Sequence, residues 1–115
     1  AYDLVVLDVA PSLTQPLKLA LTVADHIFTP IDKSLHSLCA LLQLRAMSDI
    51  PVTAVPTGEV DIAAAPLLDV SLIRASEVDG LTRNTLSILT AAKDSDVAES
   101  YRSATYSILE ILGME

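Results

Sequence analysis

Asp8 is the residue whose type and position most clearly predict chemistry in this chain. It follows residues 4–7, an aliphatic run without polar alternation, which is the pattern of a β-strand covered on both faces in a parallel sheet. Such a strand holds an aspartate rigidly at its carboxyl end, where ligands of parallel α/β sheets bind, and Mg²⁺ prefers oxygen ligands such as carboxylates. Asp8 is therefore a candidate magnesium ligand. The alternative is a solvated aspartate that ends a strand before a turn at Pro11 and Ser12.

The residues after Asp8 carry a resemblance to a known family. Asp8 to Leu13 is similar to the Walker B strand and the following switch of the ParA/MinD partition ATPases. Asp8 matches the family's aspartate that is associated with Mg²⁺, usually through water. Pro11, Ser12 and Leu13 match the end of the family's Asp-x-Pro-Pro-Ser-Leu signature, and Ala10 stands in place of its first proline.

Further segments resemble the same family in the same order along the chain. Residues 24–25 fall where the family has an Ala-Asp pair before its next strand, and residues 29–31 resemble the proline-containing end of that strand. Residues 94–101 look like the region that leads into the family's terminal helix, with tighter spacing after the aspartate. The resemblance covers residues 2–44 and 93–112 well and the middle of the chain poorly.

The resemblance implies the fold, cofactors and partners of such an ATPase. The fold class is α/β, a partial parallel-sheet P-loop NTPase-like fold with helices packed on the sheet, formed by residues 1–115 as a single domain. In this family two subunits sandwich two ATP molecules, a partner protein stimulates hydrolysis, and hydrolysis resets the dimer. The resemblance therefore implies a homodimer, ATP and Mg²⁺ as cofactors, a stimulating partition partner protein, nonspecific DNA as a further ligand, and a role in plasmid or chromosome partitioning.

The implied site is divided between residues in this chain and residues outside it. Asp8 would hold the Mg²⁺ shell, and residues 11–13 would couple the phosphate state to the dimer surface. Pro11 and Ser12 are implied cofactor-binding residues. Thr57 and Arg74 are candidates for contact with the base or ribose, beside their commoner roles as a turn threonine and a solvated arginine. A phosphate cradle needs a glycine-rich turn with successive backbone N–H groups, and the three glycines here are isolated. We therefore expect no ATP hydrolysis by this chain alone, either because it is the carboxy-terminal part of a longer ATPase domain or because it is a truncated relative.

Other interpretations of the same residues stay open. Residues 3–8 also resemble the phosphoacceptor strand of a response-regulator receiver, in which Asp8 would accept a phosphoryl group, although Lys33 lacks the proline that follows the receiver's lysine. A catalytically silent dimerisation module is the third possibility. His36 and Cys39 have the i and i+3 spacing of metal ligands, but no further ligand lies at a suitable spacing, so we expect them to be buried or half-exposed packing residues.

Charge and composition limit the ligands and the cellular location that we expect for this chain. The chain carries 7 Lys+Arg against 15 Asp+Glu, a formal net charge of -8, which disfavours a uniformly basic nucleic-acid surface. A single cysteine, Cys39, excludes an intramolecular disulfide and favours a cytoplasmic location. The longest stretch without a charged residue, residues 34–44, is shorter than the about 18 apolar residues that cross a bilayer, so no transmembrane segment is expected.

After residue 8, the hydropathy pattern predicts alternating helices and strands. Pro16 suits a first helical turn, Ser34 can cap a second helix, and Asp94 or Asp96 can cap the last one, with reciprocal capping by Glu99. Alternation favours parallel pairing, with ligand sites at the carboxyl ends of the strands. The predicted elements are a helix at 15–24, a strand at 26–30, a helix at 35–47, strands at 52–55 and 70–73, a helix at 76–92, and a last helix with Val97, Tyr101, Ala104, Ile108 and Leu112 on its apolar face.

Overall fold

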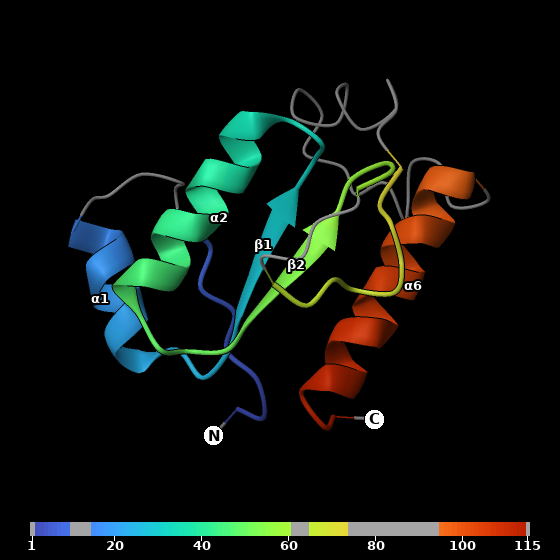
Figure 1. The fold of residues 1–115 in the computed structure, drawn as a ribbon. Coiled ribbons are helices and arrows are strands. Elements are labelled where there is room, and N and C mark those ends of the chain that lie inside the picture. Colours follow the sequence, from blue (N-terminus) through green and yellow to red (C-terminus); the bar gives the residue numbers. More distant parts are fainter. Residues whose placement is uncertain (1, 10–14, 61–64, 74–94, 115) are drawn as a thin grey trace, which may run out of the picture.

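The structure is a computed structural model and describes residues 2–9, 15–60, 65–73 and 95–114. Within these ranges the fold is mixed α/β, as predicted, and Figure 1 shows the two strands side by side between α2 and α6. The elements in chain order are α1 (Gln15–Val23), β1 (Ile27–Ile31), α2 (Leu35–Met47), β2 (Val52–Pro56) and α6 (Asp96–Ile111).

Strands β1 and β2 form a parallel pair joined by α2, the strand–helix–strand unit that the alternation predicts. The register places the first residue of β1 opposite the first of β2 and the last opposite the last. The N–H of Ile27 donates to the Pro51 carbonyl at 2.9 Å, and the N–H of Thr57 donates to the Ile31 carbonyl at 2.8 Å. Successive residues of a strand point their backbone N–H and C=O groups to opposite edges, so the nitrogen of Pro30 faces away from β2, where its missing N–H costs no ladder hydrogen bond.

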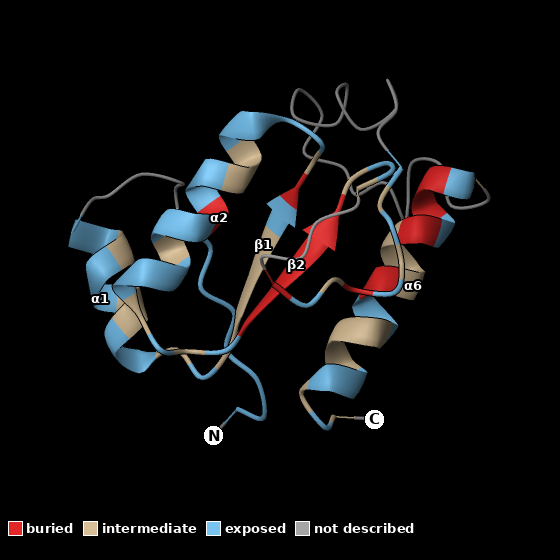
Figure 2. Ribbon diagram, viewed as in Figure 1, coloured by how far each residue is buried: buried red, intermediate tan, exposed pale blue. Residues whose placement is uncertain are grey.

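The other edge of β2 is hydrogen-bonded to an irregular segment at residues 65–72. The N–H of Ala54 donates to the Pro66 carbonyl, and the Ala54 carbonyl accepts from the N–H of Leu68, both at 2.8 Å. Strand β2 therefore has hydrogen-bonded neighbours on both edges, and all five of its residues are buried. This is the most completely covered element of the described chain (Figure 2).

The predicted strand at residues 70–73 is not formed, and this expectation was wrong. The segment is reduced to one isolated parallel bridge between Leu72 and Thr57. Leu72 donates its N–H to the Pro56 carbonyl at 2.8 Å, but Pro56 has no N–H to return to this edge. The missing donor interrupts the ladder and leaves the segment irregular.

Helices α2 and α6 cover opposite faces of the strand pair. On one face, Leu41 of α2 packs with Ile31 and Ala54. On the other face, Ala104 of α6 packs with Val55. The result is a helix–sheet–helix sandwich, in which buried residues gather on β2 and on the first turns of α6 (Figure 2).

The predicted strand at residues 4–7 is also absent, so this expectation was wrong. Leu4, Val5, Val6 and Leu7 belong to no helix or strand, and their side chains are 42%, 68%, 79% and 49% exposed. An aliphatic run becomes a covered strand only where neighbouring strands satisfy its backbone groups and other elements cover its faces. In the described part of the chain, α2 and α6 cover the β1–β2 pair instead.

The starts of α1 and α2 agree with the sequence prediction. Helix α1 begins at Gln15 with Pro16 in its first turn. Ser34 caps α2, since its hydroxyl accepts a hydrogen bond from the Ser37 N–H at 3.2 Å. Both signals depend on groups within four residues of each other, so the local sequence is enough to predict them.

The start of α6 corrects the predicted cap. Ser95 has an extended backbone, and its hydroxyl accepts from the Ala98 N–H at 3.1 Å, so Ser95 is the cap and Asp96 is the first helical residue. The carboxylate of Glu99 accepts from Arg102 at 3.3 Å, so the predicted reciprocal cap does not describe this helix. The predicted apolar face is confirmed, because its members are buried or half-buried: Val97, Tyr101, Ala104, Ile108 and Leu112.

Several predictions fall outside the described residues, namely the helix at residues 76–92 and the candidate site residues Pro11, Ser12 and Arg74. Among the helices of the described ranges, none combines the length and the hydropathy that a bilayer crossing needs.

Candidate functional site

The carboxyl ends of β1 and β2 meet at one edge of the sheet, where ligands of parallel α/β sheets bind. The hydrogen bond from the Thr57 N–H to the carbonyl of Ile31, the last residue of β1, joins the two ends. Thr57 is half-buried at this junction. Gly58 follows with φ +74°, a left-handed conformation that glycine adopts readily, and donates to the Leu72 carbonyl at 3.0 Å. The structure thus places the predicted candidate Thr57 at this strand-end edge.

Asp32, directly after β1, organises the turn into α2. Its Oδ1 accepts hydrogen bonds from the Ser34 N–H and from the Ser37 hydroxyl, both at 2.8 Å. The Ser37 hydroxyl also accepts from the Asp32 N–H at 3.4 Å. These bonds hold the carboxylate at the first turn of α2, where a negative charge interacts favourably with the helix dipole.

Sequence reasoning missed Asp32. The signal that could have found it is the spacing Asp-x-Ser-x-x-Ser at residues 32–37, which combines a side-chain turn with a helix cap. Because the carboxylate already serves the turn, we assign Asp32 a structural role at the strand-end edge.

Asp8, the first predicted site residue, is exposed and follows no strand. Within the described ranges, no group of three or more His, Cys, Asp or Glu residues is arranged to hold a metal ion. The described residues therefore supply an accessible carboxylate at Asp8 but not a complete magnesium site.

The amino ends of the strands carry a different polar contact. His26, just before β1, has its Nε2 2.9 Å from Thr53 Oγ1, a hydrogen bond, and its ring stacks on Phe28 with centroids 4.5 Å apart. Thr53 is buried, so the imidazole provides a partner for a hydroxyl that has left water. We assign this contact a structural role in joining β1 to β2.

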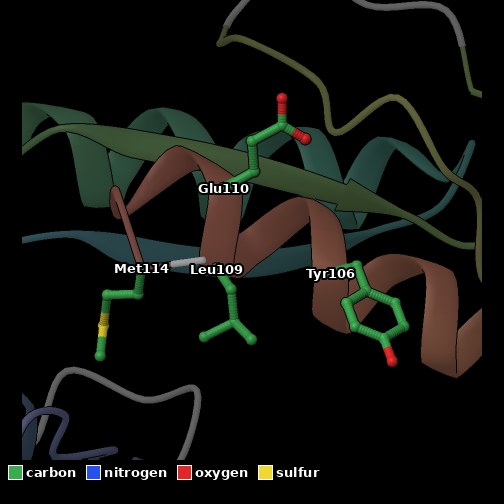
Figure 3. A pocket seen from close by; sticks show the side chains of 4 residues that line it. All are labelled: Tyr106, Leu109, Glu110 and Met114. Atoms are coloured by element: carbon green, nitrogen blue, oxygen red, sulfur yellow. The ribbon is translucent and has the colours of Figure 1, made fainter.

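A hollow of about 330 Å³ lies at the carboxyl end of α6 and is lined by Tyr106, Leu109, Glu110 and Met114. Figure 3 shows the side chains of Tyr106, Leu109 and Met114 on one side of the helix and Glu110 turned away from them. Helix α6 runs against the direction of the strands, so this hollow lies toward the amino ends of β1 and β2 (Figure 1). It is therefore separate from the strand-end edge that carries Thr57.

His36 and Cys39 are both exposed on α2, so their expected role as packing residues is not observed. The helix turns Leu41 and Leu44 toward the sheet instead. These two leucines lie on nearly the opposite side of the helix from Cys39, which accounts for its exposure.

Comparison of the chain with family models, with curated proteins and with solved structures finds no match in any of the three. The described residues thus provide a strand-end edge of the kind that binds ligands, with Thr57 upon it, and an exposed carboxylate at Asp8.

Proposed function

We propose that this chain is a segment of a ParA-like ATPase that takes part in plasmid or chromosome partitioning and binds ATP and Mg²⁺ as a homodimer. The observation that best supports the proposal is the parallel β1–α2–β2 unit, whose strand ends meet at Thr57. This unit follows the Asp8 motif in the order that the family shows. In the proposal Asp8 holds the Mg²⁺ shell, and residues 11–13 couple the phosphate state to the dimer surface.

The exposure of residues 4–7 also supports the proposal. Burying one Leu or Val side chain stabilises a fold by about 1.5–3 kcal/mol relative to leaving it exposed. Four consecutive aliphatic residues in water are therefore unfavourable, and a neighbouring strand would cover them. In the proposal, residues outside these 115 cover this aliphatic run and supply the glycine-rich phosphate-binding loop.

Turnover of Mg-ATP by the full protein that contains these residues tests the proposal. Asp8→Asn removes the carboxylate charge at nearly constant volume, and we expect turnover to fall about 10- to 100-fold, the usual loss when an outer partner of a metal is removed. Asp3→Asn is the matched control, because Asp3 is an exposed aspartate of the same segment, and it should keep the wild-type rate. Equal rates in the two variants would remove Asp8 from the site, and no Mg-ATP binding by the full protein would remove the proposal.

Phosphorylation of Asp8 is the competing outcome, favoured by the exposure of its carboxylate. Incubation with acetyl phosphate and Mg²⁺ followed by mass spectrometry separates the two functions. An added phosphoryl group that disappears in Asp8→Asn would identify a receiver-like signalling domain. An unchanged mass is the result that the ATPase proposal predicts.

A further inference from the structure

Helix α2 carries two apolar stripes on nearly opposite sides. The buried stripe contains Leu41, which is 2% exposed, and the half-buried Leu44, both packed on the sheet. The second stripe, which we call the outer stripe, is exposed and consists of Leu35, Cys39, Leu42 and Ala46. Its members are spaced by four, three and four residues, the spacing that aligns side chains along one line of a helix and forms the seam of helix pairs.

The outer stripe is unusual for a helix face in water. Leu35 is 74% exposed and Leu42 is 50% exposed, whereas the outward face of a helix on a globular protein normally carries polar and charged residues. Helix α2 has one charged residue, Arg45, and it lies beside the stripe rather than within it. A seam of this kind is the surface that a second helix covers.

We propose that the outer stripe pairs in an antiparallel arrangement with the outer stripe of a second copy of this chain. Large and small side chains alternate along it: Leu35, Cys39, Leu42, Ala46. A twofold axis between positions 40 and 41 sets Leu35 against the partner's Ala46 and Leu42 against the partner's Cys39, so each large side chain meets a small one. A parallel pair would set Ala46 against the partner's Ala46 and leave a gap there.

Charge also favours contact through α2. The formal net charge of -8 makes most surfaces of two copies repel each other. Helix α2 contains no Asp or Glu, and the acidic residues nearest to it in sequence, Asp32 and Asp49, lie beyond its two ends. In the antiparallel pair, Arg45 flanks the partner's Leu38 and His36 flanks the partner's Gln43, so no two like charges meet between the two helices themselves.

The size of the contact predicts a weak, reversible dimer. Helix α2 has 13 residues, so it is about 20 Å long and about 10 Å wide and offers about 200 Å² per copy. A standard stable interface buries about 800 Å² per partner. We therefore expect pairing at high protein concentration, without any requirement for nucleotide. This inference does not depend on the proposed ATPase function.

The chain's one cysteine, Cys39, reports directly on the contact. In the antiparallel pair the two Cys39 residues are offset by about 4.5 Å along helices whose axes lie about 8–10 Å apart, within reach of a short bismaleimide. We expect a cross-linked dimer of the full chain whose yield rises with protein concentration and is the same with and without Mg-ATP. No cross-linked dimer at millimolar concentration would overturn the proposal.

Variants at the two ends of the outer stripe test its antiparallel order. Ala46→Leu sets a leucine against the partner's Leu35, and we expect the association constant to fall at least about fivefold. The double variant Leu35→Ala with Ala46→Leu exchanges the large and small ends, so it should recover association. An Ala46→Leu variant that associates more strongly than wild type would indicate a parallel pair and contradict the proposed order.

A matched pair of variants distinguishes pairing through the outer stripe from nonspecific association. Leu42→Asn places an amide within the outer stripe and should abolish the cross-link. Leu19→Asn removes a side chain of α1 that is 66% exposed, and it should leave the cross-link unchanged. Circular dichroism checks that both variants keep their helices. Equal loss in both, or equal retention in both, would show that the outer stripe is not the contact.

Discussion

The amino-terminal region, described at residues 2–9 and 15–47, and the carboxy-terminal region, described at residues 52–60, 65–73 and 95–112, both contain many aliphatic residues but bury them to different extents. Helix α1 has no buried residue, and β1 and α2 have one each. Strand β2 is buried throughout, and α6 buries four residues. Figure 2 shows the contrast as exposed ribbon on α1 and α2 against buried ribbon on β2.

The difference follows from the position of each element in the sandwich. Strand β2 has neighbours on both edges and a helix on each face. Helix α2 has the sheet on one side only, and residues 4–7 form no strand. An apolar residue is buried only where another helix, strand or loop packs against it, so its apolar character alone does not bury it. The exposed apolar residues of the amino-terminal region therefore indicate surfaces that further protein can cover.

The largest effect that tests this contrast comes from two neighbouring leucines of α2. Leu41→Ala removes a side chain that is 2% exposed, and we expect a loss of about 2–5 kcal/mol in the free energy of unfolding. Leu42→Ala removes one that is 50% exposed, and we expect a change of about 0.5 kcal/mol or less in dilute solution. Urea denaturation followed by circular dichroism measures both. Similar losses would show that both sides of α2 are covered in the monomer.

The start of α6 provides a second test, with a smaller expected effect on the free energy of unfolding. Ser95→Ala removes the cap of α6 and should lower the free energy of unfolding by about 1 kcal/mol. Asp96→Ala removes only a favourable charge in the first turn and should cost less, about 0.3–1 kcal/mol at low salt. Thermal or urea unfolding of the two variants decides between them. A larger loss at Asp96 would reinstate the cap that the sequence pattern predicted.

The smallest effect concerns Val6, which is 79% exposed. In the 115-residue chain, Val6→Ala should change the free energy of unfolding by less than about 0.5 kcal/mol. In a longer protein whose residues cover the run at 4–7, the same substitution should cost about 1 kcal/mol or more. Parallel urea titrations of the two chains make the comparison. The same small change in both would mean that the run is not covered, which would weaken the ATPase proposal.

Local signals made most of the secondary structure predictable. Pro16 in a first turn and Ser34 at a cap act through groups within four residues, and α1, β1, α2 and β2 lie within one or two residues of their predicted bounds. At the candidate site, Thr57 lies at the strand-end edge, and its contact with a base or ribose stays a prediction. Sequence reasoning missed Asp32, whose role depends on two serines of the following turn.

The expectations that failed depend on partners distant in the sequence. Residues 4–7 have the composition of a covered strand but no described strand beside them. Residues 70–73 meet the edge of β2 at one bridge only, because Pro56 of that strand has no N–H to donate to them. A hydropathy pattern over a few residues does not show which distant residues will pair with a strand, so neither outcome could be predicted from it.

The positions of the described helices and the parallel pairing of two strands around α2 follow from local sequence, because propensities, caps and turn residues act between near neighbours. Which of the two apolar stripes of α2 is buried depends on how the helix packs against the sheet. Leu41 and Leu42 are adjacent and chemically identical, and the contact of Leu41 with Ile31 and Ala54 distinguishes them. A side chain is buried when another element packs against it, and that element comes from elsewhere in the chain.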